Sequence, residues 1–338
     1  MQLKEAKYFR KLEGNTVQCL LCPNMCIIPE GGFGICGTRK NIGGRLYTLV
    51  YGRPVAVNID PIEKKPLYHF LPGSFSVSVG TVGCNFRCRH CQNWEISMAR
   101  ADEVNVPYVA PEELVKLAQR TDCPSISYTY NEPTVFYEYV LDTARLAKAA
   151  GIRNVLVTNG YINEEPLLEL LPFIDAANID IKAMKQEALR KITPVGKLDC
   201  VLNTIKIMFE HKKWIELTYL LIPGINDDEE QLKALASFVL QELSPTVPVH
   251  VNAFHPDYKM LDVPPTPYED LLRARQLLVD AGLKFVYIGN VADLTYQQTY
   301  CPSCGQIIIK RLYMHAVEIH LVNGRCKFCG ESIPGVWE

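Results

Sequence analysis

The hydrophobic pattern of the chain alternates short β-branched runs with longer amphipathic stretches between residues 75 and 289. The runs predicted as strands are 75–81, 125–130, 154–158, 177–182, 214–222, 247–254 and 284–289. Helix candidates between them include 111–120 and 227–242, which open with Pro or acidic residues. Repeated strand–helix units predict a parallel α/β sheet that forms a full or partial (β/α)6 barrel. An open doubly wound sheet is the alternative, but no dinucleotide or P-loop glycine motif follows any strand.

Polar residues occupy every second position of several predicted strands, although strands buried between helices are normally apolar on both faces. These residues are Tyr128, Tyr130, Glu132, Asp180, Lys182, Glu216, Thr218, His250 and Asn252. An unpaired buried polar group costs about 1–3 kcal/mol. We therefore expect these faces to line the barrel interior and to bind a polar ligand. The alternative is a structural network, of which Asp180 and Lys182 would be one pair.

The composition is that of an ordinary globular protein, with 338 residues of which 48% are hydrophobic and 21% charged. The formal net charge of -2 gives no field that would draw the chain to nucleic acid or to an acidic membrane. No stretch reaches the roughly 18 apolar residues of a membrane helix, and residues 1–14 lack the apolar segment of an export signal. We expect a cytoplasmic protein that binds neither membranes nor nucleic acid.

Eleven of the thirteen cysteines fall into three tight clusters. In a long chain of a reducing compartment, clustered thiols indicate metal sites and not disulfides. The two remaining cysteines, Cys123 and Cys200, stand in apolar surroundings and are predicted to be inert core residues.

The central cluster is a CxxxCxxC motif formed by Cys84, Cys88 and Cys91, directly after the first predicted barrel strand. A 4Fe-4S cluster normally takes four protein thiolates. Three thiolates would leave one iron open to a further ligand, in the way that catalytic metal sites keep an open position. His90 is expected to pack against the cluster.

The N-terminal cluster consists of Cys19, Cys22, Cys26 and Cys36, with three glycines in the last interval. Four thiolates fit a tetrahedral zinc, which we favour, or a closed 4Fe-4S cluster acting as an electron relay. Spacing does not choose between them, and free thiols are a third alternative.

The C-terminal cluster pairs two CxxCG knuckles, which are the sequence pattern of a zinc ribbon. Its cysteines are Cys301, Cys304, Cys326 and Cys329. We expect a structural zinc that folds this short tail. His315 and His320 lie between the knuckles and are expected to be surface or packing residues.

The segment CNFRCRHC at 84–91 resembles the cluster loop of radical S-adenosylmethionine (radical SAM) enzymes. The CQNW sequence at 91–94 and the later strand-end motifs are most similar to the pyruvate formate-lyase-activating-enzyme group. Residues 59–74, IDPIEKKPLYHFLPGS, and the C-terminal CPSCG and CKFCG resemble the AmmeMemoRadiSam system radical SAM protein. The resemblance extends over about residues 17–337.

The resemblance implies a role for each matching motif. Cys84, Cys88 and Cys91 would hold a 4Fe-4S cluster whose fourth iron chelates S-adenosylmethionine. The segment Asn131-Glu132-Pro133 matches the GGEP-like segment that receives the methionyl amino group, and Thr158-Asn159-Gly160 matches the TNG turn. In the DIK segment, Lys182 would offset the methionyl carboxylate and Asp180 would accept hydrogen bonds. His250 and Asn252 are expected to contribute to the same cofactor surface.

One departure from the group is Val157, which stands where related enzymes often have an Asp before TNG. A monovalent-cation site that uses this Asp is therefore not supported. His69 and His255 are candidates for substrate contact at the barrel mouth, or alternatively structural histidines.

The resulting hypothesis has three parts: an N-terminal four-Cys extension (1–72), a radical SAM barrel (73–292) and a zinc-ribbon-like domain (293–338). The enzyme would cleave S-adenosylmethionine reductively and generate a 5′-deoxyadenosyl radical for hydrogen abstraction from an unidentified substrate. Its electron would come from a reductant such as ferredoxin or flavodoxin. A glycyl-radical-enzyme activator is the alternative within the class. A non-catalytic iron–sulfur or zinc electron carrier, or an RNA-modification adaptor, is the alternative outside it.

Overall fold

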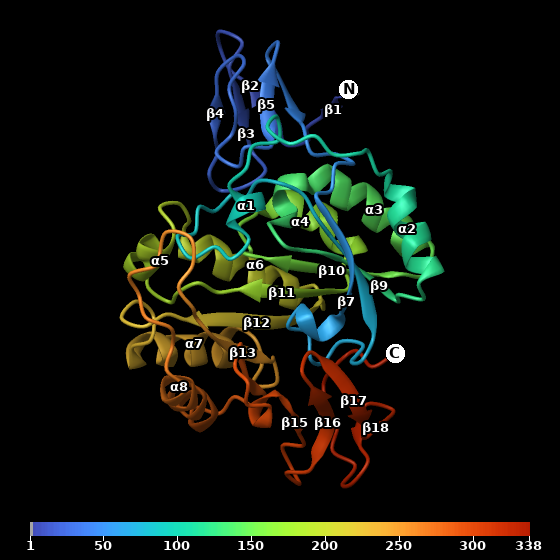
Figure 1. Cartoon of the computed structure of the whole chain (residues 1–338), viewed down its shortest axis with the longest axis vertical. Coiled ribbons are helices and arrows are strands. Elements are labelled where there is room, and N and C mark those ends of the chain that lie inside the picture. The colour runs from blue at the N-terminus through green and yellow to red at the C-terminus, as the bar shows by residue number, and fades with distance from the viewer. Residues whose placement is uncertain (1–2) are drawn as a thin grey trace.

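The centre of the molecule is an eight-stranded sheet that curls into a partial barrel, as Figure 1 shows for the computed structural model, which describes residues 3–338. Its strands are β7 (Ala56–Pro61), β8 (Phe75–Gly80), β9 (Ser125–Tyr128), β10 (Arg153–Thr158), β11 (Ala176–Asp180), β12 (Trp214–Leu221), β13 (Val249–Ala253) and β14 (Val286–Gly289). They lie side by side in chain order. Neighbouring strands from β8 to β14 are parallel, whereas β7 is antiparallel to β8. All seven strands predicted from the sequence are confirmed, and β7 is an additional one.

Helices connect the parallel strands. They are α2 (Pro111–Arg120), α3 (Tyr137–Ala149), α4 (Glu164–Leu170), α5 (Gln186–Ile192), α6 (Leu198–Glu210), α7 (Glu229–Glu242) and α8 (Tyr268–Asp280). Shorter elements are α1 (Trp94–Ser97), η1 (Ile62–Lys64), η2 (Pro133–Phe136), η3 (Leu171–Phe173) and η4 (Thr295–Gln297). A doubly wound sheet reverses its strand order at a switch point, and this sheet does not. The partial barrel is confirmed, and the doubly wound alternative is wrong.

Helix α7 illustrates how the sequence starts these helices. Asp228 precedes α7 and accepts a hydrogen bond from the backbone N–H of Gln231 at 3.0 Å, which caps the first turn. Glu229 in that turn places negative charge at the positive end of the helix dipole. Leu232 and Leu235 then recur at a spacing of three and are both buried.

The N-terminal extension consists of two small antiparallel sheets at the top of Figure 1. One contains β1 (Lys4–Glu5), β5 (Arg39–Ile42) and β6 (Arg45–Thr48), and the other contains β2 (Phe9–Lys11), β3 (Val17–Cys19) and β4 (Ile27–Ile28). The extension is joined to α3 by a buried ion pair in which Arg39 Nη2 lies 2.7 Å from Glu138 Oε1. The chain then enters the barrel sheet as β7, so residues 56–61 belong to that sheet. The division of the chain into three domains stays a prediction.

The C-terminal segment forms a separate β-structure at the bottom of Figure 1, beside the strands β12 to β14. It contains β15 (Thr299–Tyr300), β16 (Ile307–Leu312), β17 (His315–Ile319), β18 (Leu321–Val322) and β19 (Arg325–Cys326). Its buried residues pack with Phe285 and Tyr287, which lie at the start of the last barrel strand. The segment therefore covers the base of the barrel, opposite the carboxyl ends of the strands.

Residues 62–71 fill that base. Their apolar side chains pack against β10 and β11 in one buried cluster. The backbone N–H groups of Tyr68 and His69 donate hydrogen bonds to the Glu216 carboxylate at 2.9 and 2.7 Å. Glu216 also accepts from Trp214 Nε1 at 3.1 Å and lies 2.7 Å from His250 Nε2. Hydrogen bonds from several donors thus stabilise this buried carboxylate, as a buried charge requires.

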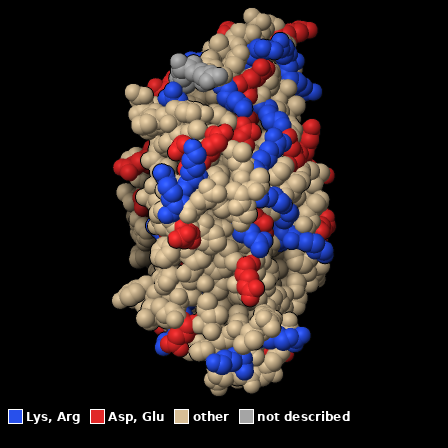
Figure 2. All heavy atoms as spheres, turned by 90° about the vertical axis from the view of Figure 1, so that its right-hand side faces the viewer, with Lys and Arg blue, Asp and Glu red and all other residues tan. Residues whose placement is uncertain are grey.

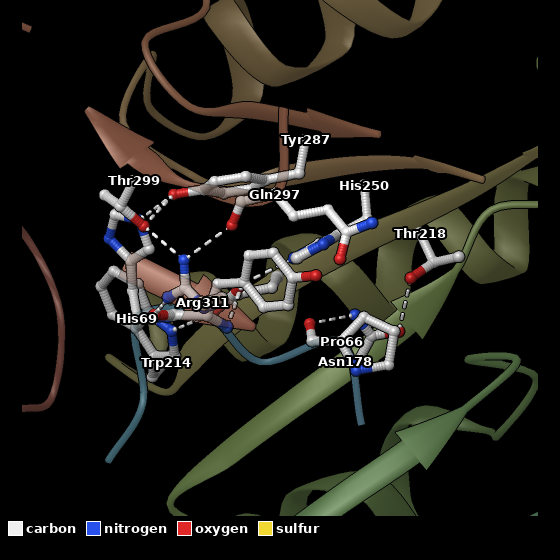
Figure 3. Close-up of polar contacts among 12 residues, drawn as sticks. Pro66, His69, Asn178, Trp214, Thr218, His250, Tyr287, Gln297, Thr299 and Arg311 are labelled. Carbon is white, nitrogen blue, oxygen red and sulfur yellow. Dashed lines mark hydrogen bonds and ion pairs between the residues drawn. The ribbon is translucent and has the colours of Figure 1, made fainter. Parts of the chain in front are cut away.

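A hydrogen-bond chain joins the C-terminal segment to the same base (Figure 3). Arg311 Nη1 donates to Thr299 Oγ1 at 2.8 Å, the Thr299 hydroxyl lies 2.9 Å from the Tyr287 hydroxyl, and Tyr287 lies 2.6 Å from His69 Nε2. The chain ends at the Pro334 carbonyl, 2.8 Å from His69 Nδ1. A guanidinium only donates and a carbonyl only accepts, so the direction of every bond is fixed. His69 is therefore the Nδ1–H tautomer, with Nε2 as acceptor.

Charged side chains of both signs are interspersed over the face shown in Figure 2. Within residues 3–338, no helix combines the length and the apolar character needed to span a bilayer.

Candidate active site

A large pocket lies at the carboxyl ends of the barrel strands and contains about 1490 Å³ of unfilled space, counting the part open to solvent. Its polar lining includes Lys64, Lys65, Cys84, Cys88, His90, Cys91, Tyr130, Asn131, Thr158, Asn159, Asn178, Asp180, Lys182, Thr218 and Asn252. In a parallel α/β barrel this end carries the active site. Motifs that are far apart in the sequence therefore meet in one cavity.

The three cysteines of the central cluster reach the pocket from the loop between β8 and α1. The loop is held by backbone hydrogen bonds from Arg89 N to Ile192 O at 2.9 Å and from Gly83 N to Ile96 O at 2.8 Å. Burial raises the pKa of the Cys88 thiol to about 12, although Lys182 acts in the opposite direction. Thiols with raised pKa values release their protons when they bind metal.

The spacing of these three thiols does not fit one metal ion. Among the described residues, the one group of three or more His, Cys, Asp or Glu whose ligand atoms all lie within 4.8 Å of one another is the C-terminal cysteine set. Cys84, Cys88 and Cys91 nevertheless line the same pocket. Three separated thiols around one cavity fit a larger multi-iron cluster.

Asp180 and Lys182 lie on the inner face at the end of β11 and form an ion pair. Burial alone would lower the pKa of Lys182, but the neighbouring Asp180 and Cys88 raise it well above its ordinary value. The Oδ1 atom of Asp180 is buried and has no protein partner. The pocket therefore offers a cation and an unused acceptor near the cysteines, a combination that suits a zwitterionic amino acid.

Glu132 organises the turn after β10 and is fully buried. Its carboxylate accepts hydrogen bonds from Thr158 Oγ1 and Asn159 N, both at 2.8 Å, and from Thr134 N at 3.0 Å and Thr134 Oγ1 at 2.7 Å. It is not among the residues that line the pocket. This position differs from the expected direct contact with a methionyl amino group, because all four bonds come from the protein itself. Pro133 is likewise buried, at the start of η2.

Thr158 and Asn159 do line the pocket, and Asn159 lies beside the cysteine loop. Its Nδ2 donates to Asn85 Oδ1 at 2.9 Å and lies 3.9 Å from Cys84 Sγ. Asn131 is also in the lining, where its Nδ2 donates to the Gly83 carbonyl at 2.8 Å. These amides hold the start of the cysteine loop against two strand ends.

The alternation of polar residues correctly placed Asp180, Thr218 and Asn252 on the inner face. It also placed His250 inward, but one layer deeper than the pocket. His250 stacks on Tyr287 with ring centroids 5.2 Å apart and contacts Glu216, so it belongs to the network of the base. His250 is therefore not part of the pocket lining, and its contact with a cofactor stays a prediction.

On β9 the predicted alternation of inward-facing polar residues does not hold. The hydroxyl of Tyr128 donates to Asn154 Oδ1 at 3.0 Å, and Asn154 Nδ2 donates to a backbone carbonyl of α3, so Tyr128 points toward the helices. Ser127 faces inward instead, 2.6 Å from Ser76. Tyr130 reaches the pocket because it follows the strand with a φ of +73°, which breaks the period of two.

The two histidines that were candidates for substrate contact, His69 and His255, lie in different parts of the molecule. His69 is fully buried in the base, and burial lowers its pKa to about 4, so its expected place over the cysteines is wrong. His255 is exposed and its Nε2 lies 2.7 Å from Nε2 of Gln92, a residue of the pocket lining. His90 is buried in the lining, with its Nδ1 unpartnered.

Sequence reasoning missed a group at the β7 side of the pocket. Lys65 is buried, and its Nζ lies 2.7 Å from Asp60 Oδ2, which also accepts from Tyr130 OH at 2.6 Å. Asn178 is a second omission: its Nδ2 donates to Pro66 O and its Oδ1 accepts from Thr218 at 2.8 Å each (Figure 3). The double lysine was visible in the sequence, but its placement required the unpredicted pairing of β7.

The other two cysteine clusters lie on opposite sides of the barrel. In the C-terminal set, Cys301 and Cys329 sulfurs are 3.5 Å apart, and those of Cys304 and Cys326 are 3.7 Å apart. The cysteines of the N-terminal set line a cavity of their own, with about 330 Å³ of unfilled space when the part open to solvent is counted. All thirteen cysteines are free; Cys123 is buried and Cys200 partly so.

Comparisons with known proteins agree with this geometry. The model of the radical SAM superfamily matches residues 78–236. An uncharacterized protein of Methanocaldococcus jannaschii is 47% identical over 333 residues, which cover 98% of this chain and 99% of that protein. The pyruvate formate-lyase-activating enzyme of Clostridium pasteurianum is 27% identical over 202 residues, or 54% of this chain and 80% of that enzyme.

A solved structure, the radical SAM methyltransferase from Sphaerobacter thermophilus, shares the fold with a TM-score of 0.51 and 16% identity. The match covers 90% of this chain and 81% of that one. The fold and the three-cysteine pocket define an enzyme of the partial-barrel class that works with an iron–sulfur cluster. The chain belongs to the radical SAM superfamily, and this membership implies a 4Fe-4S cluster and S-adenosylmethionine as cofactors.

Proposed function

We propose that Cys84, Cys88 and Cys91 hold a 4Fe-4S cluster with one iron open to S-adenosylmethionine, and that the enzyme removes a hydrogen atom from a substrate in the barrel. The observation that carries this proposal is the meeting of three thiols with the unpartnered Asp180 oxygen in one pocket. The thiols suit the cluster, and the acceptor suits the amino-acid part of S-adenosylmethionine.

A reduced cluster held by Cys84, Cys88 and Cys91 would supply the one electron that splits the sulfur–C5′ bond of S-adenosylmethionine, giving methionine and a 5′-deoxyadenosyl radical for hydrogen abstraction from the substrate. The electron would come from a low-potential carrier such as a ferredoxin or flavodoxin. The residues of the chain bind and orient the reactants.

Several residues have distinct parts in that orientation. Lys182 would stand beside the methionyl carboxylate, and Asp180 would accept hydrogen bonds from the amino-acid or ribose part of the cofactor. Asn252 extends the same polar surface and fits there because Gly289 lies opposite: a Cβ on Gly289 would stand 2.1 Å from Asn252 Oδ1. Glu132 acts one step further back, by holding Thr158 and Asn159 in position.

The base of the barrel contributes by excluding water from the reaction. Residues 62–71 fill the end opposite the pocket, and the C-terminal segment covers them. A primary radical reacts with nearly any neighbour, so a closed interior protects the reaction.

Activation of a glycyl-radical enzyme is a second candidate function. The similarity to the Clostridium activating enzyme favours it. The position of the C-terminal segment also favours it, because this segment contacts the base and leaves the mouth to other elements. An activator needs a mouth that admits a protein loop. A mixture with candidate radical enzymes, followed by electron paramagnetic resonance for a glycyl radical, decides between the two functions.

We also propose one structural zinc at the C-terminal cysteines. In a tetrahedral site with Zn–S bonds of about 2.3 Å, neighbouring sulfurs lie ~3.8 Å apart. The sulfur separations of 3.5 and 3.7 Å in the structure are close to that value. The thirteen free cysteines fit a reducing compartment, and we propose the cytoplasm as the location.

The test of the enzymatic function is anaerobic reconstitution followed by reduction with dithionite in the presence of S-adenosylmethionine. We expect 5′-deoxyadenosine and methionine in equal amounts, together with a change in the paramagnetic resonance signal of the reduced cluster when S-adenosylmethionine is added. A cluster that reduces normally, yields no 5′-deoxyadenosine and ignores S-adenosylmethionine would support the non-catalytic carrier instead. His90→Ala is a useful companion, because cleavage must survive it if His90 is not an iron ligand.

A further inference from the structure

The cavity of the N-terminal extension is the second place where four cysteines converge, and we propose that it takes a redox-active 4Fe-4S cluster and not a zinc ion. The four cysteines are Cys19 at the end of β3, Cys22 and Cys26 in the following turn, and Cys36 before β5. This proposal reverses the preference for zinc that the sequence suggested.

The spacing of the sulfurs distinguishes the two kinds of site. A single zinc ion draws its four sulfurs to about 3.8 Å from one another. The C-terminal set meets this condition, with all four sulfurs within 4.8 Å. Among residues 3–338 that set is the one group of three or more His, Cys, Asp or Glu ligand atoms that all lie within 4.8 Å of one another, so the N-terminal sulfurs are not packed within that limit. A cubane cluster is a larger body than one ion and requires such a wider arrangement.

The cavity itself has the character of a buried cluster site. It contains about 330 Å³ of unfilled space, counting the part open to solvent, and apolar side chains such as Leu21, Ile28 and Val135 complete its wall. Thiols lose their protons when they bind metal, so the four cysteines would hold a cluster as thiolates.

A buried arginine offers a hydrogen-bond donor to this cavity. Arg39 lines the cavity with 1% of its surface exposed, and its Nη2 pairs with Glu138. Its Nε has no partner in the protein. A guanidinium N–H beside an iron–sulfur cluster can donate to a cluster sulfur, and such hydrogen bonds tune the reduction potential.

The cavity directly adjoins the catalytic cysteine loop. Asn85, the residue after Cys84, lines the N-terminal cavity and accepts from Asn24 at its carbonyl at 2.8 Å. The contact is close enough to require a glycine: a Cβ on Gly83 would stand 2.4 Å from the Cys36 carbonyl oxygen. One layer of bonded residues therefore separates the two cysteine sets.

This adjacency gives the second cluster a role that rests on the proposed function. It would accept one electron from a low-potential carrier protein and pass it to the catalytic cluster, which then reduces S-adenosylmethionine. Each transfer moves one electron and no atoms, so the second cluster returns to its oxidised state after each transfer. Zinc has no redox chemistry and would leave this path empty.

Metal analysis of the anaerobically reconstituted wild-type chain tests the proposal. We expect about eight iron, eight sulfide and one zinc per chain, the zinc being that of the C-terminal set. About four iron and two zinc per chain would overturn it. This count needs no variant and no activity, so its outcome is independent of whether S-adenosylmethionine is cleaved.

Two variants then assign the iron. A C84A/C88A/C91A variant should retain about four iron and show a reducible cluster by paramagnetic resonance, whereas C19S/C22S should lose about four iron and retain the signal that responds to S-adenosylmethionine. Cys200→Ser, which removes a thiol outside all three sets, should lose none. A natively folded C84A/C88A/C91A chain without iron would contradict the assignment.

The relay has its own readout. Two reduced clusters one residue layer apart should interact magnetically, so the spectrum of the reduced wild-type protein should differ from the sum of the two variant spectra. A spectrum equal to that sum would refute the relay, whereas failure of S-adenosylmethionine cleavage with eight iron bound would count against the proposed function alone.

Discussion

Asn159 donates from its Nδ2 to Asn85 Oδ1 at 2.9 Å, and this bond ties the turn after β10 to the cysteine loop after β8. Tyr161 closes the link, because its carbonyl accepts from Asn85 Nδ2 at 2.7 Å and its N–H donates to Asn159 Oδ1 at 2.9 Å. Two motifs 74 residues apart therefore form one unit. A change in either should alter the position of the other.

Glu132 is the anchor of this unit, and Glu132→Gln should loosen it. The carboxylate accepts four hydrogen bonds, and an amide would present N–H groups to some of those donors. We expect a loss of about 1–3 kcal/mol in the free energy of unfolding and at least tenfold weaker binding of S-adenosylmethionine. Urea unfolding and equilibrium dialysis measure the two effects. The exposed Glu187→Gln is the control, and equal behaviour of both variants would exclude an anchoring role.

The cysteine sets should separate chemistry from stability. Cys88→Ala should abolish formation of 5′-deoxyadenosine because it removes a ligand of the catalytic cluster. Cys304→Ala should leave some cleavage but lower the unfolding temperature, because a structural metal site contributes folding energy. Product analysis and thermal unfolding of both variants check this division. The reverse pattern would contradict it.

The buried His69 should make folding sensitive to mild acid. Burial lowers its pKa from 6.5 to about 4. Between these values the unfolded chain binds a proton that the native protein does not, so stability is full above pH 6.5 and falls as the pH drops toward 4. From pH 7.5 to 5.0 this residue should account for a loss of about 2 kcal/mol in the free energy of unfolding.

Urea unfolding at the two pH values measures this loss. His69→Gln should show a smaller difference between pH 7.5 and 5.0 than the wild type. The exposed His255→Gln should keep the wild-type difference. If all three proteins respond alike, His69 is not the group that titrates.

The pair Lys65–Asp60 should support the β7 side of the pocket. Lys65 is buried, and its loss would leave Asp60 with Lys64 and Tyr130 as partners. We expect Lys65→Met to cost about 1–3 kcal/mol of unfolding free energy. Lys64→Met removes an exposed partner of the same carboxylate and should cost less than about 1 kcal/mol. Equal losses in urea unfolding would show that burial of Lys65 does not matter.

The fold could be predicted from the sequence where the local hydrophobic pattern of a segment matches its place in the sheet. The parallel strands are short β-branched runs with helices between them, and that arrangement determines the sheet order. Strand β7 was not predicted because Ala56–Pro61 pairs antiparallel at the sheet edge and has no helix before it. Its half-exposed residues, such as Ile59, do not produce the pattern of a buried strand.

The site could be predicted where its polar residues lie at the ends of strands. Asp180, Lys182 and Asn252 follow the period of two and reach the pocket as expected. The depth of a residue within the barrel does not appear in that period, which is why His250 was placed one layer too high. Tyr130 shows a second limit, since a positive φ at the end of β9 reverses the face without any sign in the sequence.

Closure of the barrel base by residues 62–71 imposes an order on turnover. Because that end is closed, cofactor, substrate and products would all enter and leave through the pocket at the carboxyl ends of the strands. If S-adenosylmethionine occupies the depth beside Asp180 as proposed, it enters before the substrate, and methionine and 5′-deoxyadenosine leave after the altered substrate. Closure of the base would thus give the enzyme an ordered sequence of binding and release.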